Sequence, residues 1–110
     1  MPTTQVLKLA DHLIGQVPHK MSGNTIRTGH RPIMPGPLSF ESVSGSLRPV
    51  EVMVDSVRHA TAAELTMEEI VLNGSADRDA FMEDMRAFYP DFSPDSDVTV
   101  VAWSRAGERP

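Results

Sequence analysis

The stretch DVTVVAW, Asp97–Trp103, has the most pronounced β-strand pattern in the chain. β-Branched and aromatic residues fill most of its positions, which is typical of a strand packed within a sheet. Two further segments, Leu38–Glu41 and Val50–Asp55, alternate apolar and polar residues and are separated by the turn-forming sequence SGS at 44–46. We therefore predict a hairpin and a separate C-terminal strand as the centre of the fold.

Two helices are predicted between the hairpin and the last strand. Thr66 and Glu69 form a T-x-x-E capping box, in which each side chain accepts a hydrogen bond from a backbone amide of the other residue. This helix should end near Asn73 and Gly74. A second helix should open at Ser75 and stop at Pro90, with an apolar stripe at helical spacing. The members of that stripe are Phe81, Met85 and Phe88.

Upstream of the hairpin, the sequence predicts a short strand at Val6–Leu9 and a helix over Ala10–Val17. Glycine and proline recur through residues 18–37, which predicts a loop containing one short strand, Asn24–Arg27. Strands with clustered rather than alternating helices indicate an α+β fold, most simply a small barrel.

Length and composition favour one compact domain over residues 1–110. The chain has no cysteine, which excludes thiolate metal sites and disulfides. We expect a cytoplasmic protein without a signal peptide or membrane span, because the N-terminus lacks an apolar run and no segment approaches about 20 apolar residues.

Charge is unevenly distributed along the chain, whose net charge is −5. No acidic residue lies between Asp11 and Glu41, and this interval contains Lys20, Arg27 and Arg31. An acidic protein is poorly suited to charge-driven binding of long nucleic acid, so we expect no DNA partner and only local contact with RNA. The alternative interpretation of the basic segment is an ordinary solvated surface.

Several segments, in this order, resemble the ASCH family. Thr25-Ile-Arg27 followed by Pro35–Phe40 resembles the family's lysine–threonine–x–threonine–x–arginine strand and its proline–glycine turn. Leu65–Glu69 with Asn73-Gly74 resembles the segment before its last helix, and residues 81–101 resemble its closing helix, Tyr-Pro stop and final strand. The resemblance covers residues 5–104.

The resemblance implies a PUA-like β-barrel with helices packed at its openings, a fold associated with RNA binding. Some small ASCH proteins are amidohydrolases that remove the acetyl group of N4-acetylcytidine with a lysine, a threonine and a glutamate. Here the alignment places Ser22 at the family's lysine position and Gly23 at the following threonine, with Lys20 two residues upstream. The family's glutamate is also missing near Gly74, and these two departures leave enzymatic activity uncertain.

Amide hydrolysis requires a nucleophile or activated water, a base and a proton shuttle. On the resemblance, the candidate catalytic residues are Thr25 as nucleophile or water holder, Lys20 as base, and Glu69 as the group that orients the base. Each also has a structural interpretation: a strand residue, a solvent-facing lysine and a member of the capping box.

Arg27 is the principal candidate for ligand binding, because its planar donor fork can hold a phosphate or a base edge with two hydrogen bonds. Arg31 would extend the same wall, and Ser22 and Tyr89 complete the predicted binding set. The histidines show no ligand spacing, so we predict no metal and no cofactor.

Three functional classes follow from these residues. The first is a module that binds RNA or a nucleoside-sized ligand in a basic pocket. The second is an amidohydrolase acting on an acylated nucleoside such as N4-acetylcytidine. The third is a protein with a degenerate pocket used only for protein–protein contact. The sequence leaves the oligomeric state open.

Overall fold

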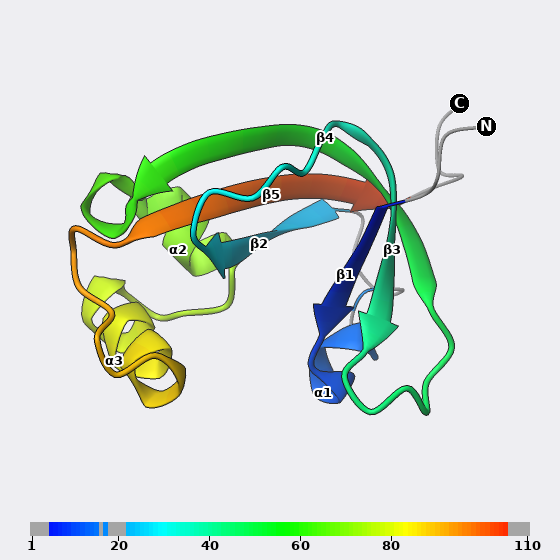
Figure 1. Ribbon diagram of the computed structural model, residues 1–110, viewed down its shortest axis with the longest axis horizontal. Helices are drawn as coiled ribbons and strands as arrows, with labels where there is room; N and C mark the ends of the chain where they lie inside the picture. The colour runs from blue at the N-terminus through cyan, green and yellow to red at the C-terminus, as the bar shows by residue number, and fades with distance from the viewer. Residues whose placement is uncertain (1–4, 16, 18–21, 106–110) are drawn as a thin grey trace. The chain divides into compact units, whose positions relative to one another are not determined.

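The computed structural model describes residues 5–15, 17 and 22–105. Its strands form one five-stranded mixed sheet in the order β1-β3-β4-β5-β2 (Figure 1). The α+β prediction is confirmed, and this sheet is compatible with a PUA-like barrel. The strands are β1 Gln5–Leu9, β2 Ser22–Thr28, β3 Gly36–Ser42, β4 Val50–Thr61 and β5 Asp97–Arg105; the helices are α1 Asp11–Ile14, the 3-10 helix η2 Ala62–Glu64, α2 Met67–Leu72 and α3 Arg78–Phe88.

The strand pairings explain why the sheet is mixed. β1 runs parallel to β3, with Leu7 opposite Phe40, whereas β3 and β4 form the predicted antiparallel hairpin. The connection between β3 and β4 contains Gly45 at φ 76°, a left-handed conformation that glycine adopts without steric cost. β4 continues to Thr61, well beyond the predicted end at Asp55.

Contacts divide the chain into two compact units. Unit 1 comprises Met1–Gly23, Ile33–Ser56 and Ala102–Pro110, and unit 2 comprises Asn24–Pro32 and Val57–Val101. β2, β4 and β5 contribute residues to both. The predicted single domain stays a prediction, and each unit is described by itself.

Alternate residues of β3 and of the first half of β4 contribute to the core of unit 1. Leu38, Phe40, Val52 and Val54 are buried because successive residues of a strand point to opposite faces. Trp103 is also buried and contacts Phe40 edge to face with ring centroids 5.8 Å apart. An aromatic pair at this separation adds stability beyond its buried area.

α1 is shorter than predicted. It spans Asp11–Ile14, with Ala10 at the N-cap and Gly15 at the C-cap, whereas the sequence pattern favoured Ala10–Val17. Glycine costs about 1 kcal/mol in a helix interior, so it is a natural place for a short helix to end. Ile14 and Val17 are nevertheless buried, as their apolar character indicates.

The core of unit 2 forms where α2 and α3 cover one face of the sheet. Val98 and Val100 of β5 and Ile26 of β2 belong to this cluster. From the helical side it includes Ile70 of α2 and Phe81 of α3. The remaining members are Ala60, Ala62, Leu65, Met82 and Phe92.

α2 begins where its capping box predicts. Thr66 is the N-cap, its side chain accepts a hydrogen bond from Glu69 N at 3.1 Å, and Glu69 Oε1 accepts one from Thr66 N at 2.9 Å. The helix ends at Leu72 with Asn73 as C-cap, followed by Gly74 at φ 108°. Local hydrogen bonding thus fixes both ends of the element.

α3 differs from its prediction in two respects. It begins at Arg78 rather than Ser75, because the Asp77 side chain accepts a hydrogen bond from Ala80 N at 2.8 Å and is the N-cap. The predicted apolar stripe is wrong at Phe88, which is 79% exposed in the last turn. Phe81 and Met82 are buried, so the core-facing stripe ends one turn earlier.

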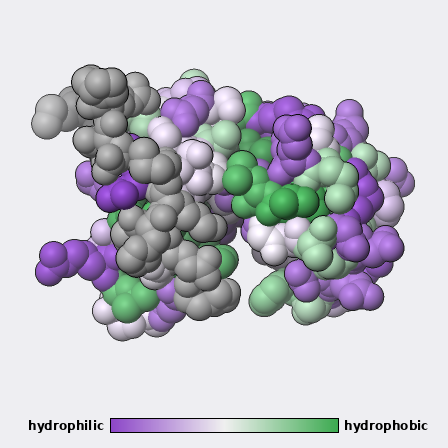
Figure 2. All heavy atoms as spheres, turned by 180° about the vertical axis from the view of Figure 1, so that it is seen from behind, coloured by the Kyte–Doolittle hydropathy of each residue, from purple (hydrophilic) through white to green (hydrophobic). Residues whose placement is uncertain are grey.

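Surface hydrophobic residues of unit 2 are not confined to α3. Met67, Val71 and Leu72 of α2 are about half exposed. Figure 2 shows hydrophobic side chains reaching the surface among hydrophilic ones in the view from behind. Within the described ranges, no helix has the length and apolar character needed to cross a membrane.

Candidate functional site

β2 places two of the predicted residues on one face of the sheet. Ile26 points into the helical core of unit 2. Since side chains alternate along a strand, Thr25 and Arg27 point to the opposite face. The same argument places Thr99 on that face, because its neighbours Val98 and Val100 belong to the core. Thr25 and Thr99 are both buried there.

The segment after β2 is fastened across this face by Thr99. The Thr99 hydroxyl donates a hydrogen bond to Gly29 O at 2.7 Å and accepts one from Arg31 N at 2.9 Å. Gly29 has φ 77°, which allows the chain to turn at this point. The Arg31 backbone therefore has a fixed position on the same face as Arg27.

Two histidines tie this segment to β4. His59 Nε2 donates to Arg31 O at 2.9 Å, and His30 Nε2 donates to Ala60 O at 3.2 Å. The two imidazole rings stack with centroids 4.9 Å apart. This pair could not be predicted from the sequence, because its members are 29 positions apart and become neighbours only through tertiary structure.

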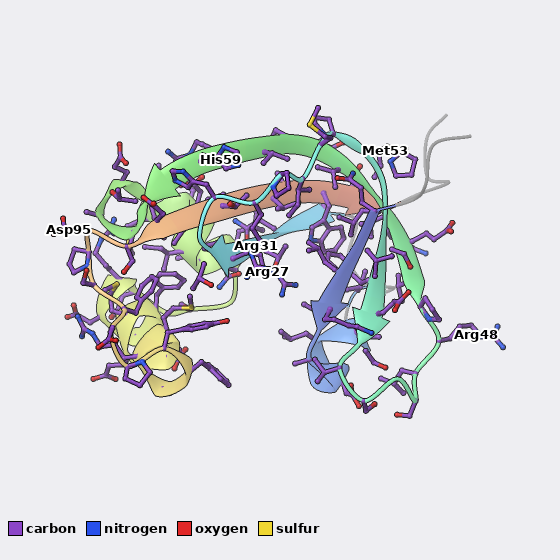
Figure 3. The ribbon with its side chains drawn as sticks, in the orientation of Figure 1. Arg27, Arg31, Arg48, Met53, His59 and Asp95 are labelled. Atoms are coloured by element: carbon purple, nitrogen blue, oxygen red, sulfur yellow. The ribbon has the colours of Figure 1, made fainter. Side chains whose placement is uncertain are left out.

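Arg27 is the most unusual side chain of the site. Its Nε and Nη2 are buried and have no hydrogen-bond partner among the described residues. Burial is the largest effect that lowers the pKa of Arg27, followed by the positive charge of Arg31, while Tyr89 acts in the opposite direction. Figure 3 shows Arg27 and Arg31 close together beside β2, whereas Arg48 extends outward from the connection between β3 and β4. The predicted basic wall therefore has two members that influence each other electrostatically.

Arg31 is held by its own local hydrogen bonds. Its Nε donates to Thr28 O at 2.9 Å, and its Nη2 lies 3.5 Å from Thr28 Oγ1. These contacts occupy the Nε–Nη2 edge of the Arg31 guanidinium. Arg31 therefore contributes mainly positive charge to the site.

Tyr89 lies at the C-cap of α3 and is 46% exposed. It acts on the pKa of Arg27, which places it within electrostatic range of the guanidinium. With Thr28, Gly29 and Phe92 it lines an open hollow of about 310 Å³, whose wall also contains Asp91, Ser96 and Asp97. Tyr89 is thus an accessible aromatic residue within electrostatic range of Arg27.

Glu69 is engaged by another arginine. Arg58 Nε donates to Glu69 Oε2 at 3.0 Å and Arg58 Nη2 donates to Oε1 at 2.6 Å. This hydrogen bonding to Arg58 is the main cause of a lowered pKa for the Glu69 carboxyl group. The predicted capping-box role of Glu69 is confirmed by its contacts with Thr66, and its catalytic role stays a prediction.

Ser22 and Lys20 are the remaining predicted site residues. Ser22 begins β2 and is exposed, in unit 1. Lys20 lies outside the described residues. In the part of the chain that the structure describes, no group of three or more His, Cys, Asp or Glu side chains is arranged to hold a metal ion.

Asn24 is a polar residue of unit 2 that the sequence reasoning missed. Its Nδ2 donates to Glu69 O at 3.1 Å, while its Oδ1 is buried without a hydrogen-bond partner among the described residues. Asparagine is depleted in strands, so its occurrence inside β2 was a usable signal. Asn24 links β2 to α2 at the side of the helical core.

The comparisons with known proteins show the fold. No model of a known protein family matches the sequence, and no curated protein matches it. The chain is similar to the crystal structure of protein EF3133 from Enterococcus faecalis, described with the family DUF984, with a TM-score of 0.66 and 13% identity over 96% of this chain and 78% of that one. It is also similar to the hypothetical protein PH0355, with a TM-score of 0.68 and 16% identity over 93% of this chain and 98% of the other.

Proposed function

We propose that this chain is an ASCH-type protein that binds RNA or a modified nucleoside through a site centred on Arg27. The observation that carries the proposal is the buried Nε–Nη2 edge of Arg27, which has no partner among the described residues. Burying an unpaired charged donor costs free energy that a complementary ligand can offset. The DUF984 fold is ASCH-like, which agrees with the family resemblance of the sequence.

The surroundings of Arg27 support a small polar ligand rather than a long nucleic acid. Arg31 supplies a second positive charge and Tyr89 an accessible ring, whereas the protein as a whole carries a net charge of −5. RNA-binding modules use this combination, in which a base stacks on an aromatic ring while donors hold the backbone or a base edge. The expected contact is one nucleotide wide.

Binding of short RNA tests the proposal directly. Fluorescence anisotropy with a labelled single-stranded octanucleotide, together with a thermal-shift screen of modified nucleosides, should show binding by the wild type. Arg27→Ala should weaken binding at least tenfold. The control is Arg48→Ala, which removes an exposed arginine of unit 1 and should leave binding unchanged. Equal binding by wild type and Arg27→Ala, or no binding to any of these ligands, would overturn the proposal.

The second candidate is hydrolysis of an acylated nucleoside such as N4-acetylcytidine. Thr25 favours it, because this residue shares a strand face with Arg27 and is two positions away. Thr25→Val should then stop deacetylation while leaving nucleoside binding intact. Chromatographic detection of cytidine separates the two functions, since a binding module releases no cytidine, either as the wild type or as Thr25→Val.

A further inference from the structure

The Arg58–Glu69 pair shows how an arginine of this protein grips an anion. Its Nε and Nη2 donate to two different oxygens of one carboxylate, at 3.0 and 2.6 Å. This side-on arrangement is the geometry in which the planar guanidinium matches two oxygens bound to one central atom. Phosphate presents oxygens in the same way, and arginine binds it bidentately for this reason.

Arg27 has the same edge free. The buried Arg27 atoms without partners among the described residues are Nε and Nη2, the pair that Arg58 uses. The Arg27 residue as a whole is half-buried, so part of it reaches solvent, whereas the Nε and Nη2 atoms themselves lie beneath the surface. Binding of two oxygens at this edge therefore requires the guanidinium to turn toward solvent.

The charge around Arg27 distinguishes an anion from a neutral base edge. Arg31 lies near enough to lower the pKa of Arg27, although burial has the larger effect. A neutral base edge would satisfy the donors of Arg27 but leave the repulsion between the two cations unchanged. A phosphate satisfies the donors and attracts both cations, so it offsets both costs.

Tyr89 offers a contact for the part of the ligand beyond its phosphate. The residue is 46% exposed and lies within electrostatic range of Arg27. A base attached to a phosphate at Arg27 can stack on the tyrosine ring, and such stacking contributes about 1–3 kcal/mol in nucleic-acid-binding proteins. Inorganic phosphate makes no such contact.

We propose that the Arg27 edge binds two phosphate oxygens of a nucleotide, so that the site selects phosphorylated ligands over free nucleosides. This proposal rests on the proposed function, because it names which part of the ligand the basic site recognises. The shared chemistry is a phosphate oxyanion, present both as a terminal monoester and as the diester linkage of RNA.

Titration calorimetry separates these ligands. The probes are the four ribonucleosides, their 5′-monophosphates, a tetraribonucleotide without terminal phosphate, and inorganic phosphate. At least one monophosphate or the tetranucleotide should bind tenfold or more tightly than the corresponding nucleoside. Inorganic phosphate should bind more weakly than that ligand. Preference for the tetranucleotide identifies the diester as the natural source, and preference for a monophosphate identifies a mononucleotide.

Arg27→Lys is the decisive variant, because it keeps a positive charge but loses the two-donor edge. It should lose most of the advantage of the phosphorylated ligand, whereas the matched control Arg48→Lys should retain it. Equal affinity for nucleoside and nucleotide, with both lost in Arg27→Ala, would overturn this inference and leave the proposed function standing. Equal affinity for inorganic phosphate and nucleotides, or full affinity in Arg27→Lys, would also overturn it. Absence of binding to every probe would overturn both.

Discussion

Two arginines of unit 2, Arg58 and Arg27, differ in their burial and in whether their guanidinium groups have a partner. Arg58 is exposed at the surface of β4 and has a complete partner, since its Nε–Nη2 edge holds both oxygens of Glu69. Arg27 is more buried on β2, and the same edge has no partner among the described residues. The side chain with the greater need for a partner is therefore the one that lacks it.

The pKa shifts of the two arginines have opposite directions. Hydrogen bonding to Glu69 raises the pKa of Arg58, whereas burial and then Arg31 lower the pKa of Arg27. The environment of Arg58 stabilises the folded chain. The environment of Arg27 costs stability, and proteins retain such costs most often at functional sites. This difference is why Arg27 rather than Arg58 is the centre of our proposal.

Removing the partner of Arg58 should have the largest effect on stability. Glu69→Ala deletes both the ion pair and the reciprocal half of the capping box at Thr66. Because Arg58 is 43% exposed, the ion pair is worth at most about 1 kcal/mol, and the cap contributes about 1 more, so we expect a loss of about 2 kcal/mol. Urea denaturation measures it.

The control for this variant is Glu68→Ala on the same helix. Glu68 is exposed in the first turn of α2, so its loss should change stability by less than about 0.5 kcal/mol. Equal effects of the two substitutions would mean that the observed pair does not stabilise the protein.

Removing the charge of Arg27 should have the opposite sign. Arg27→Met keeps much of the side-chain volume and removes a buried charge without a partner, so we expect a gain of about 1 kcal/mol in the absence of ligand. The matched Arg58→Met should lose about 1 kcal/mol. Destabilisation by both substitutions would show that Arg27 has a protein partner in solution.

The elements predicted best are those specified by neighbouring residues. The capping box at Thr66 and the strand beginning at Asp97 depend on local hydrogen bonding and on β-propensity, and both are confirmed. The error at Phe88 has a tertiary cause, because a helical period does not reveal where the surface beneath the helix ends.

The candidate site was less accessible to prediction because its geometry is nonlocal. The sequence indicated a basic segment containing Arg27 and Arg31, and in the structure both Arg31 and Tyr89 act electrostatically on Arg27. The pairing of Arg58 with Glu69 could not be predicted from the sequence, since it depends on how α2 lies against β4. Whether a cation is buried or exposed depends on such contacts between distant segments.

Supplying Arg27 with a carboxylate should make it resemble Arg58. Arg31→Glu converts a repulsive neighbour into an attractive one, although it also removes the contacts of Arg31 with Thr28. Relative to Arg31→Gln, which removes only the cation, we expect a gain of about 0.5 kcal/mol that falls as salt increases. Denaturation in 20 mM and 500 mM NaCl measures it. No difference between the two variants would mean that position 31 does not act electrostatically on Arg27.

Acidification should weaken the Arg58–Glu69 pair by a similarly small amount. The folded pKa of Glu69 is lowered from its usual 4.5 by Arg58, so the folded state favours the ionised carboxylate. The contribution is complete above the unfolded pKa and is lost as pH falls through the lower folded pKa. We expect the stability advantage of wild type over Glu69→Gln to shrink by about 0.5 kcal/mol between pH 6 and pH 3. Glu64 has a pKa lowered by its hydrogen bonds from Thr61 and titrates in both proteins, so their difference isolates Glu69. An advantage that stays constant or grows over this range would contradict the paired state of Arg58, and with it the contrast that singles out Arg27.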